Sequence, residues 1–313
     1  MFKIKSVYSV IIPVYNEEEV ISESYKQLKK VMDKTNEKYE LVFINDGCKD
    51  KSPEILADLC KRDDNVVLIN FSRNFGHQNA ITAGMDYAEG DAILIIDADL
   101  QDPPEVMLEM IEKWKSGYQV IYGKRKERRG ETFFKLFTAK VYYRILKSLT
   151  SVDIPVDTGD FRLIDRKVCD TMKKLPEKNR YVRGLVSWVG YRQTSVEYVR
   201  EERFAGETKY PLKKMLKLAL DGITSFSHKP LRVSTVIGFA FSILSFVYLL
   251  FVLLQKFFTD KTIQGWASTI AVLLFTQGVV LMMLGLIGEY IGRIYEEEKG
   301  RPNYIVDEVL GRE

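Results

Sequence analysis

Residues 95–105 read Ile-Ile-Asp-Ala-Asp-Leu-Gln-Asp-Pro-Pro-Glu, so an apolar run passes directly into two aspartates and then into a helix-start signal. Alternate residues of an extended chain share one face, and Asp97 and Asp99 can therefore converge on one cation, with an oxygen of Gln101 as a further ligand. Oxygen ligands of this kind suit Mg²⁺ or Mn²⁺, and an ion held this way can bind a diphosphate. Because an isolated Asp-x-Asp is most often a solvated loop, this interpretation depends on the surrounding pattern.

The residues after the aspartates predict a helix. Asp102 can cap its first turn, Pro103 suits the first helical position because its missing N–H is no loss, and Glu105 completes a capping box. The aspartates are therefore expected in a strand-to-helix turn.

Three earlier apolar runs end in the same way, in polar or glycine-containing turns. They are residues 7–12, 41–44 and 66–70, and helical patterns lie between the runs near 17–34, 52–62 and 77–88. This alternation predicts an α/β fold with a mainly parallel, doubly wound sheet. Ligands of such sheets bind beyond the carboxyl ends of the strands, where the aspartates lie.

The C-terminal third differs in composition from the rest of the chain. Residues 233–254 and 266–288 carry no charged side chain, and a membrane-spanning helix needs about 20 apolar residues. We therefore predict a domain over residues 1–210, two transmembrane helices within 230–292, and a tail over 293–313. A buried soluble hairpin is the alternative for the two apolar runs.

Charge indicates how the chain would be oriented. Lysines and arginines precede the first apolar run and follow the second, which places both termini and the first domain in the cytoplasm by the positive-inside rule. No signal peptide is expected before the first strand. The three cysteines fit a reducing compartment. The net charge of +3 among 313 residues makes nucleic acid a poor candidate partner.

Two further segments have an apolar stripe beside basic residues. They are a helix expected at about residues 133–149 and a juxtamembrane helix at 211–229. Both compositions suit a helix lying in the membrane interface. Ordinary amphipathic helices packed on the first domain are the alternative.

Five motifs in this order resemble family-two glycosyltransferases, which have a Rossmann-like GT-A fold. The motifs are residues 10–18, 45–47, 73–77, 97–105 and 157–163. The two apolar runs and the tail Arg301-Pro302-Asn303-Tyr304 extend the resemblance to polyprenyl-phosphate glycosyltransferases of the bactoprenol glucosyltransferase and dolichyl-phosphate mannose synthase type.

The resemblance implies a metal-dependent hexosyltransferase that inverts the anomeric centre, and it assigns roles to residues of this chain. Asp157 would act beside the acceptor oxygen as a base or an orienting group, and Asp160 competes for that role. Asp99 would share the catalytic role with Asp157. Donor binding would fall to Pro13, Tyr15, Glu17, Asp46, Asp97, Asp99 and Gln101, the last three with Mg²⁺ or Mn²⁺. Phosphate and acceptor binding would fall to Arg125, Arg128, Arg162, Arg203, Thr208 and Lys209. For Arg125 and Arg128 a solvated basic loop is the alternative.

The implied partners are a nucleotide sugar, a polyprenyl phosphate and the inner (plasma) membrane, with a homotetramer suggested by the resemblance alone. UDP-glucose is the favoured donor, while GDP-mannose, UDP-N-acetylhexosamine and UDP-amino-arabinose stay open. A non-catalytic membrane scaffold is the alternative from another class. The chain departs from the common family pattern at Asn45, where aspartate is frequent, and at Cys48, where serine is frequent.

Overall fold

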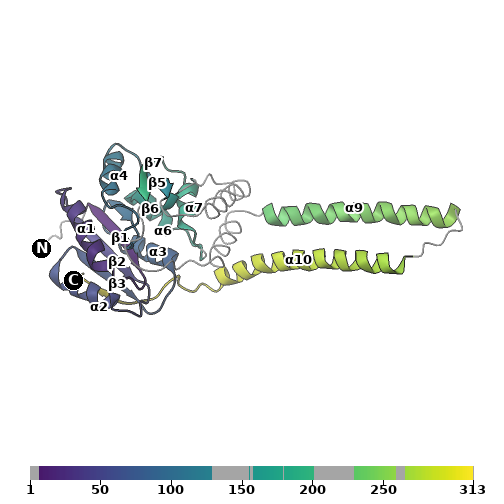
Figure 1. Ribbon diagram of the computed structural model, residues 1–313, viewed down its shortest axis with the longest axis horizontal. Coiled ribbons are helices and arrows are strands. Elements are labelled where there is room, and N and C mark those ends of the chain that lie inside the picture. The colour runs from purple at the N-terminus through teal and green to yellow at the C-terminus, as the bar shows by residue number, and fades with distance from the viewer. Residues whose placement is uncertain are drawn as a thin grey trace.

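The computed structural model describes residues 7–128, 155, 158–178, 180–200, 229–258 and 265–312. Its centre is an eight-stranded sheet in the order β7-β5-β6-β4-β1-β2-β3-β8 (Figure 1). The strands are β1 (Tyr8–Val14), β2 (Tyr39–Asn45), β3 (Val66–Phe71), β4 (Ala92–Ile95), β5 (Val120–Arg128), β6 (Thr158–Asp165), β7 (Gln193–Arg200) and β8 (Val306–Leu310). The helices are α1 (Ile21–Asp33), α2 (Ser52–Arg62), α3 (His77–Tyr87), α4 (Val106–Lys115), α6 (Arg166–Lys173), α7 (Val182–Trp188), α9 (Lys229–Phe258) and α10 (Trp266–Glu298).

The predicted fold class is confirmed, with a mixed rather than wholly parallel sheet. Strands β1 to β4 run parallel to their neighbours among themselves, whereas β6 is antiparallel to both β4 and β5. The four predicted strands and three predicted helices of the N-terminal half are all present, with ends shifted by a few residues. The parallel strands place their carboxyl ends along one edge of the sheet.

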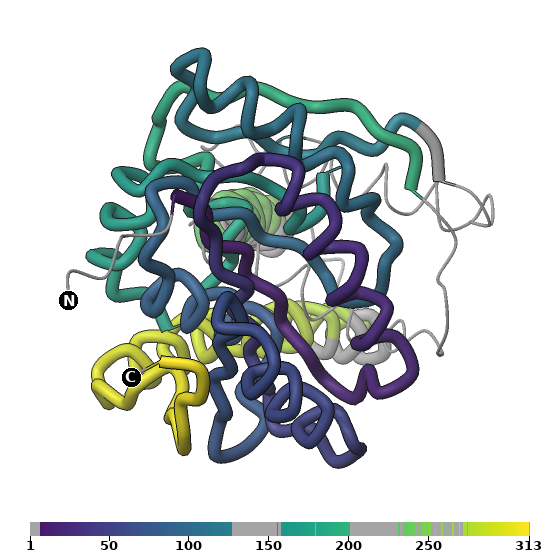
Figure 2. The backbone as a smooth tube through the Cα atoms, turned by 90° about the vertical axis from the view of Figure 1, so that its left-hand side faces the viewer, coloured from purple at the N-terminus to yellow at the C-terminus, as the bar shows by residue number. Residues whose placement is uncertain are grey.

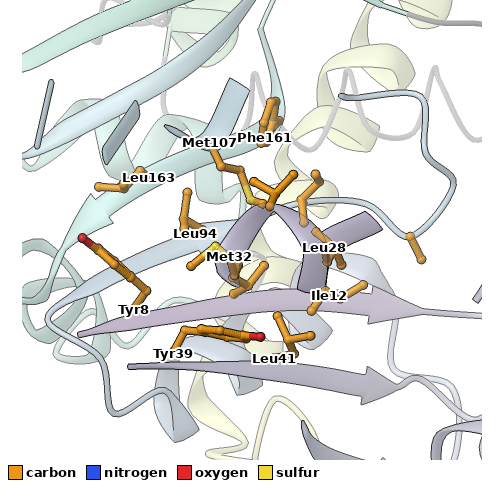
Figure 3. Close-up of a cluster of buried hydrophobic side chains, with 14 of the residues drawn as sticks. Tyr8, Ile12, Leu28, Met32, Tyr39, Leu41, Leu94, Met107, Phe161 and Leu163 are labelled. Carbon is orange, nitrogen blue, oxygen red and sulfur yellow. The ribbon is translucent and has the colours of Figure 1, made fainter. Parts of the chain in front are cut away.

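Buried side chains on both faces of the sheet explain why the parallel strands are so apolar. One core packs the sheet against α1, α2 and α4, and it includes Leu28, Leu41 and Met107 (Figure 3). The other core packs the opposite face against α3, α6 and α7. A strand covered on both faces has no position for a solvated side chain, so hydrophobic residues run continuously along it.

Strand β1 continues through Pro13, which sequence reasoning placed after the strand. Proline cannot donate a ladder hydrogen bond, but β4 pairs with β1 only as far as Ile11. Beyond that point β1 pairs with β2 alone, with Pro13 opposite Ile44. Pro13 therefore prolongs the strand at the sheet edge where the candidate site begins.

The predicted helix start after the aspartates is wrong in detail. Helix α4 begins at Val106, and no side chain caps it. Asp102 accepts a hydrogen bond from Tyr198 instead. Pro103 and Pro104 have no N–H groups to be capped, so the Asp102 carboxylate is available for this long-range contact.

Helices occupy both apolar runs. Figure 1 shows α9 and α10 extending side by side away from the sheet, and the rings of Phe241 and Phe275 lie 5.8 Å apart between them. Within the described residues, one segment, Phe275–Glu298, is long and apolar enough to cross a membrane. The crossing by two helices therefore stays a prediction, and so do the domain boundaries.

The tail after α10 returns to the sheet. Strand β8 pairs antiparallel with β3, and the Tyr304 ring stacks on Phe71 at 5.1 Å. Arg312 Nη2 lies 2.6 Å from Glu40 Oε2. Figure 2 shows this yellow tail at the side of the domain. The sequence pattern of residues 293–313 predicts no strand, so β8 is an addition to the predicted fold.

Candidate active site

The Asp-x-Asp motif lies directly after β4. The strand ends at Ile95, and the Ile96 N–H still donates to the Ile11 carbonyl of β1 at 3.1 Å. Leu100 then adopts a positive φ of 57°, which is uncommon for a residue with a side chain. This turn brings the Gln101 N–H to Asp99 Oδ1 at 3.2 Å. The loop is thereby held beyond the carboxyl end of the sheet.

The charges around Asp97 fit a divalent cation. Its Oδ1 atom is buried and has no hydrogen-bond partner among the described residues. Burial and the charges of Asp99 and Asp102, opposed by His77, raise the pKa of Asp97 to about 6. A cation would offset this surplus of negative charge. The described residues contain no preformed group of three acidic, histidine or cysteine ligands. Mg²⁺ or Mn²⁺ held by Asp97 and Asp99 would therefore keep further coordination positions for substrate oxygens.

Asp160 is the hub of a second cluster. Its carboxylate accepts hydrogen bonds from Arg183 Nε at 2.8 Å and Arg183 Nη2 at 3.0 Å, and from Gln78 Nε2 at 3.3 Å. His77 Nε2 lies 3.2 Å from Asp160 Oδ2 and 3.6 Å from Asp97 Oδ1. The histidine therefore contacts Asp160 at hydrogen-bonding distance and lies near Asp97 at ion-pair distance only.

These contacts argue against Asp160 as a base. Although burial opposes it, the charge of Arg183 and the hydrogen bonds of His77 and Arg183 hold the pKa of Asp160 well below its usual range. A carboxylate this acidic, with its oxygens already accepting hydrogen bonds, is a poor proton acceptor. Its rival Asp157 lies outside the described residues, and its role stays a prediction.

Arg162 faces inward from β6. It donates from Nε to the Asp160 carbonyl at 3.2 Å and from Nη2 to the Gly159 carbonyl at 2.8 Å. Burial lowers the pKa of Arg162 to about 10. These contacts support the backbone at Gly159 and Asp160, and the contact of Arg162 with phosphate stays a prediction.

Arg125 lies against the same motif. Its Nε donates to the Tyr198 hydroxyl at 3.3 Å, and a Cβ added to Gly159 would come within 2.5 Å of Arg125 Nη2. Arg128 belongs to the same strand, β5. The structure thus brings Arg125 to the motif that follows Asp157.

The predicted donor-binding residues gather at the ends of β1 and β2. Pro13 is buried within β1, and Tyr15 is exposed just beyond it. The Glu17 N–H donates to Ser52 Oγ at 3.0 Å. Asp46 accepts from the N–H groups of residues 75 and 76 and from Asn74 Nδ2. Its carboxylate thus holds the loop before α3, and its predicted contact with the base stays a prediction.

The two departures from the family pattern retain hydrogen-bonding roles. Asn45 Oδ1 accepts from the Cys48 N–H at 2.9 Å, and its Nδ2 donates to Asn70 at 2.9 Å. The Cys48 sulfur accepts from the Asn16 N–H at 3.2 Å. Burial raises the pKa of Cys48 to about 11, so this thiol is neutral and unreactive at physiological pH.

Several predicted residues and segments fall outside the described part of the chain. They are Asp157, Arg203, Thr208 and Lys209, the helix expected at 133–149 and most of the juxtamembrane segment 211–229. The side chain of Arg128 is likewise outside the described set.

Sequence reasoning missed Arg183, Gln78 and Tyr198. Arg183 lies in a short apolar helix and Tyr198 in an alternating strand, and neither setting suggests a polar role. The one available signal was an arginine among the buried residues of α7, because a buried guanidinium requires a partner.

Comparison with known proteins agrees with this geometry. Residues 9–172 match the model of glycosyl transferase family 2, and the chain belongs to this family. Residues 229–294 match the GtrB C-terminal hairpin, which coincides with α9 and α10.

Relatives are similar over nearly their whole length. An uncharacterized glycosyltransferase of Bacillus subtilis, YkcC, is 64% identical over 98% of this chain and 95% of that protein. An uncharacterized glycosyltransferase of Synechocystis, sll0501, is 46% identical over 97% of this chain and 96% of its own. The bactoprenol glucosyl transferase of Shigella phage SfV is 43% identical over 95% of this chain and 97% of its own.

Proposed function

We propose that the protein transfers one sugar, glucose from UDP-glucose, to a polyprenyl phosphate such as undecaprenyl phosphate at the cytoplasmic face of the plasma membrane. The observation that carries the proposal is the union of a family-2 domain with a GtrB-type hairpin in one chain. Relatives named bactoprenol glucosyl transferase are 43% identical over 95% of this chain, a span that includes both matched regions. A lipid acceptor requires the catalytic domain to work at a membrane, and the hairpin would hold it there.

The lengths of the two helices support a membrane hairpin. Helix α9 has 30 residues and α10 has 33, which correspond to about 45 and 50 Å at about 1.5 Å per residue. Both exceed the roughly 30 Å hydrocarbon core of a bilayer. Large apolar side chains such as Phe246, Phe251 and Leu281 are exposed on their surfaces, as lipid contact would require. With the basic flanking residues inside, both termini would be cytoplasmic.

The reaction would be a single in-line displacement. An oxygen of the acceptor phosphate attacks the anomeric carbon, the bond from this carbon to the nucleoside diphosphate breaks, and the configuration inverts. A phosphate monoester has a second pKa of about 6 and is already mostly dianionic at neutral pH. Asp157 would therefore orient the acceptor more than deprotonate it.

The described residues divide the remaining work. A divalent cation, when bound, would supply positive charge to the departing diphosphate, and Asp97 and Asp99 would hold it. Arg125, beside Gly159, would receive the acceptor phosphate, because a guanidinium fork matches phosphate oxygens. Asp160 would hold the motif that contains Gly159 in place through its contacts with Arg183.

The experiment is sugar transfer by the purified full chain in detergent. Undecaprenyl phosphate would be incubated with a panel of radiolabelled nucleotide sugars, with and without Mn²⁺, using wild type, Asp99→Asn and Asp58→Asn. Asp58 is a matched control because it is an exposed aspartate on α2, paired with Arg62.

We expect a Mn²⁺-dependent lipid product from UDP-glucose with wild type and Asp58→Asn, and loss of it with Asp99→Asn. A product from another donor, such as GDP-mannose, would support the proposed reaction and show that UDP-glucose is not the donor. No product from any donor would refute sugar transfer to this lipid and favour the scaffold alternative.

A further inference from the structure

A buried tyrosine, Tyr198, connects Asp102 in the Asp-x-Asp loop to Arg125. The Tyr198 hydroxyl donates to Asp102 Oδ1 at 2.5 Å and accepts from Arg125 Nε at 3.3 Å. Tyr198 is only 5% exposed, and its ring packs edge-on against Phe161 at 5.6 Å. The hydroxyl therefore has a fixed position between Asp102 and Arg125.

The terminal nitrogen Nη2 of Arg125 lies in space that is open because residue 159 is a glycine. A Cβ at residue 159 would come within 2.5 Å of Arg125 Nη2, so the guanidinium rests on bare backbone. Tyr198 engages Nε at the other end of the same group. A guanidinium held at Nε can still present its two terminal nitrogens side by side to an oxyanion.

Asp102 supplies the charge behind this arrangement. It is 1% exposed, and Oδ2 has no hydrogen-bond partner among the residues that the structure describes. Burial would lower the pKa of Arg125, but the charges of Asp102 and Tyr198 and the Tyr198 hydrogen bond outweigh burial and raise it. Arg125 therefore remains a cation in a partly desolvated position, where its attraction to phosphate is strong.

We propose that Tyr198 and Asp102 are positioning residues for the acceptor, which fix Arg125 so that its terminal nitrogens receive the phosphate of the polyprenyl phosphate. This proposal rests on the proposed function and extends it to Tyr198 and Asp102, to which the family resemblance assigns no role in binding. Asp102 lies in the same loop as Asp97 and Asp99. One chain of contacts thereby links the donor's metal-binding loop to the acceptor's phosphate.

The test separates the kinetic parameters of the two substrates. Tyr198→Phe keeps the ring and its packing and removes the hydroxyl. We expect the KM for undecaprenyl phosphate to rise about tenfold, the scale of one hydrogen bond to a charged group, with the KM for the nucleotide sugar unchanged. In an Arg125→Ala background, adding Tyr198→Phe should raise the acceptor KM no further, because the arginine through which it acts is gone.

Tyr25→Phe is the matched control. It also removes a partly buried hydroxyl that donates to a carboxylate, Asp63 at 2.7 Å, but on the α1 side of the domain. It should leave both KM values unchanged.

The outcomes are distinct. An unchanged acceptor KM in Tyr198→Phe, an equal rise in both KM values, or additive effects with Arg125→Ala would overturn the positioning role while sugar transfer by wild type still stood. No transfer by wild type would overturn the proposed function itself, and this proposal with it.

Discussion

Breaking the Asp160–Arg183 pair should destabilise the domain strongly. Asp160→Asn keeps the size of the side chain but removes its charge and turns one acceptor into a donor. The carboxylate it replaces is 4% exposed and accepts two hydrogen bonds from Arg183. The amide would remove the negative charge that faces Arg183 and place N–H groups opposite each other.

The expected magnitude follows from the burial of the two partners. Removing one partner of a buried ion pair costs about 3–5 kcal/mol. The Arg183 side chain is 22% exposed and water can solvate part of it, so we expect the lower end, about 3 kcal/mol. For a domain of roughly 150–250 residues this corresponds to a Tm lower by about 6–12 °C.

The assay is thermal unfolding of the full chain in detergent for Asp160→Asn, Arg183→Met and the double variant. Because the double variant leaves neither charge uncompensated, it should cost about 2 kcal/mol less than the sum of the single variants. Costs that add would refute the reasoning, since they would show that the two residues stabilise the fold independently.

The same pair has a defined pH dependence. Because the folded-state pKa of Asp160 lies below its ordinary value of 3.8, its contribution is fully present above that value and is lost as the pH falls through the folded pKa. Burial would lower the pKa of His77, but the charges of Asp97 and Asp160 raise it to about 9. The His77 contribution is therefore full below 6.5 and lost as the pH rises through about 9. Both contributions are full between pH 3.8 and 6.5, so the difference in Tm between wild type and Asp160→Asn should be largest in this range.

Three further perturbations test other parts of the structure. Gly84→Ala should lower the Tm, because a Cβ there clashes with the side chain of Ile11. Overpacking costs about 1–3 kcal/mol, whereas the higher helix propensity of alanine stabilises by about 1 kcal/mol. An unchanged Tm would mean that α3 can shift on the sheet. Mn²⁺ binding, followed by calorimetry, should tighten as the pH rises through about 6, where Asp97 loses its proton; an affinity independent of pH would remove Asp97 from the ligand set. Gly159→Ala should displace the Arg125 guanidinium while the fold survives, so the acceptor KM should rise severalfold with little change in Tm; an unchanged acceptor KM would argue against the placement of Arg125.

The N-terminal half of the fold could be predicted because its signals are local. Buried strands flanked by helices produce continuous apolar runs, and each run ended where a polar turn began. The C-terminal strand β8 could not be found in this way. Its sequence, Val-Asp-Glu-Val-Leu, is short and two of its five residues are charged. Its pairing with β3 joins residues more than two hundred positions apart.

Capping at residue 102 shows a conflict between local and tertiary interactions. The pattern Asp-Pro-Pro-Glu predicts a capped helix, and a helix does follow. The carboxylate is nevertheless drawn to Tyr198, 96 positions away in the chain. A buried phenol needs an acceptor, and no short-range rule reveals which residue will provide it.

The site also shows why residue type alone does not assign a role to an acidic residue. Asp97 and Asp160 both contact His77, yet their pKa values shift in opposite directions. Asp160 is surrounded by donors, so its charge is already used to hold β6 against α3 and α7. Asp97 has a buried oxygen without a hydrogen bond among the described residues, and such an arrangement is costly unless a ligand completes it. The carboxylate that the fold leaves unsatisfied is therefore the better candidate for the cation, and the satisfied one for support.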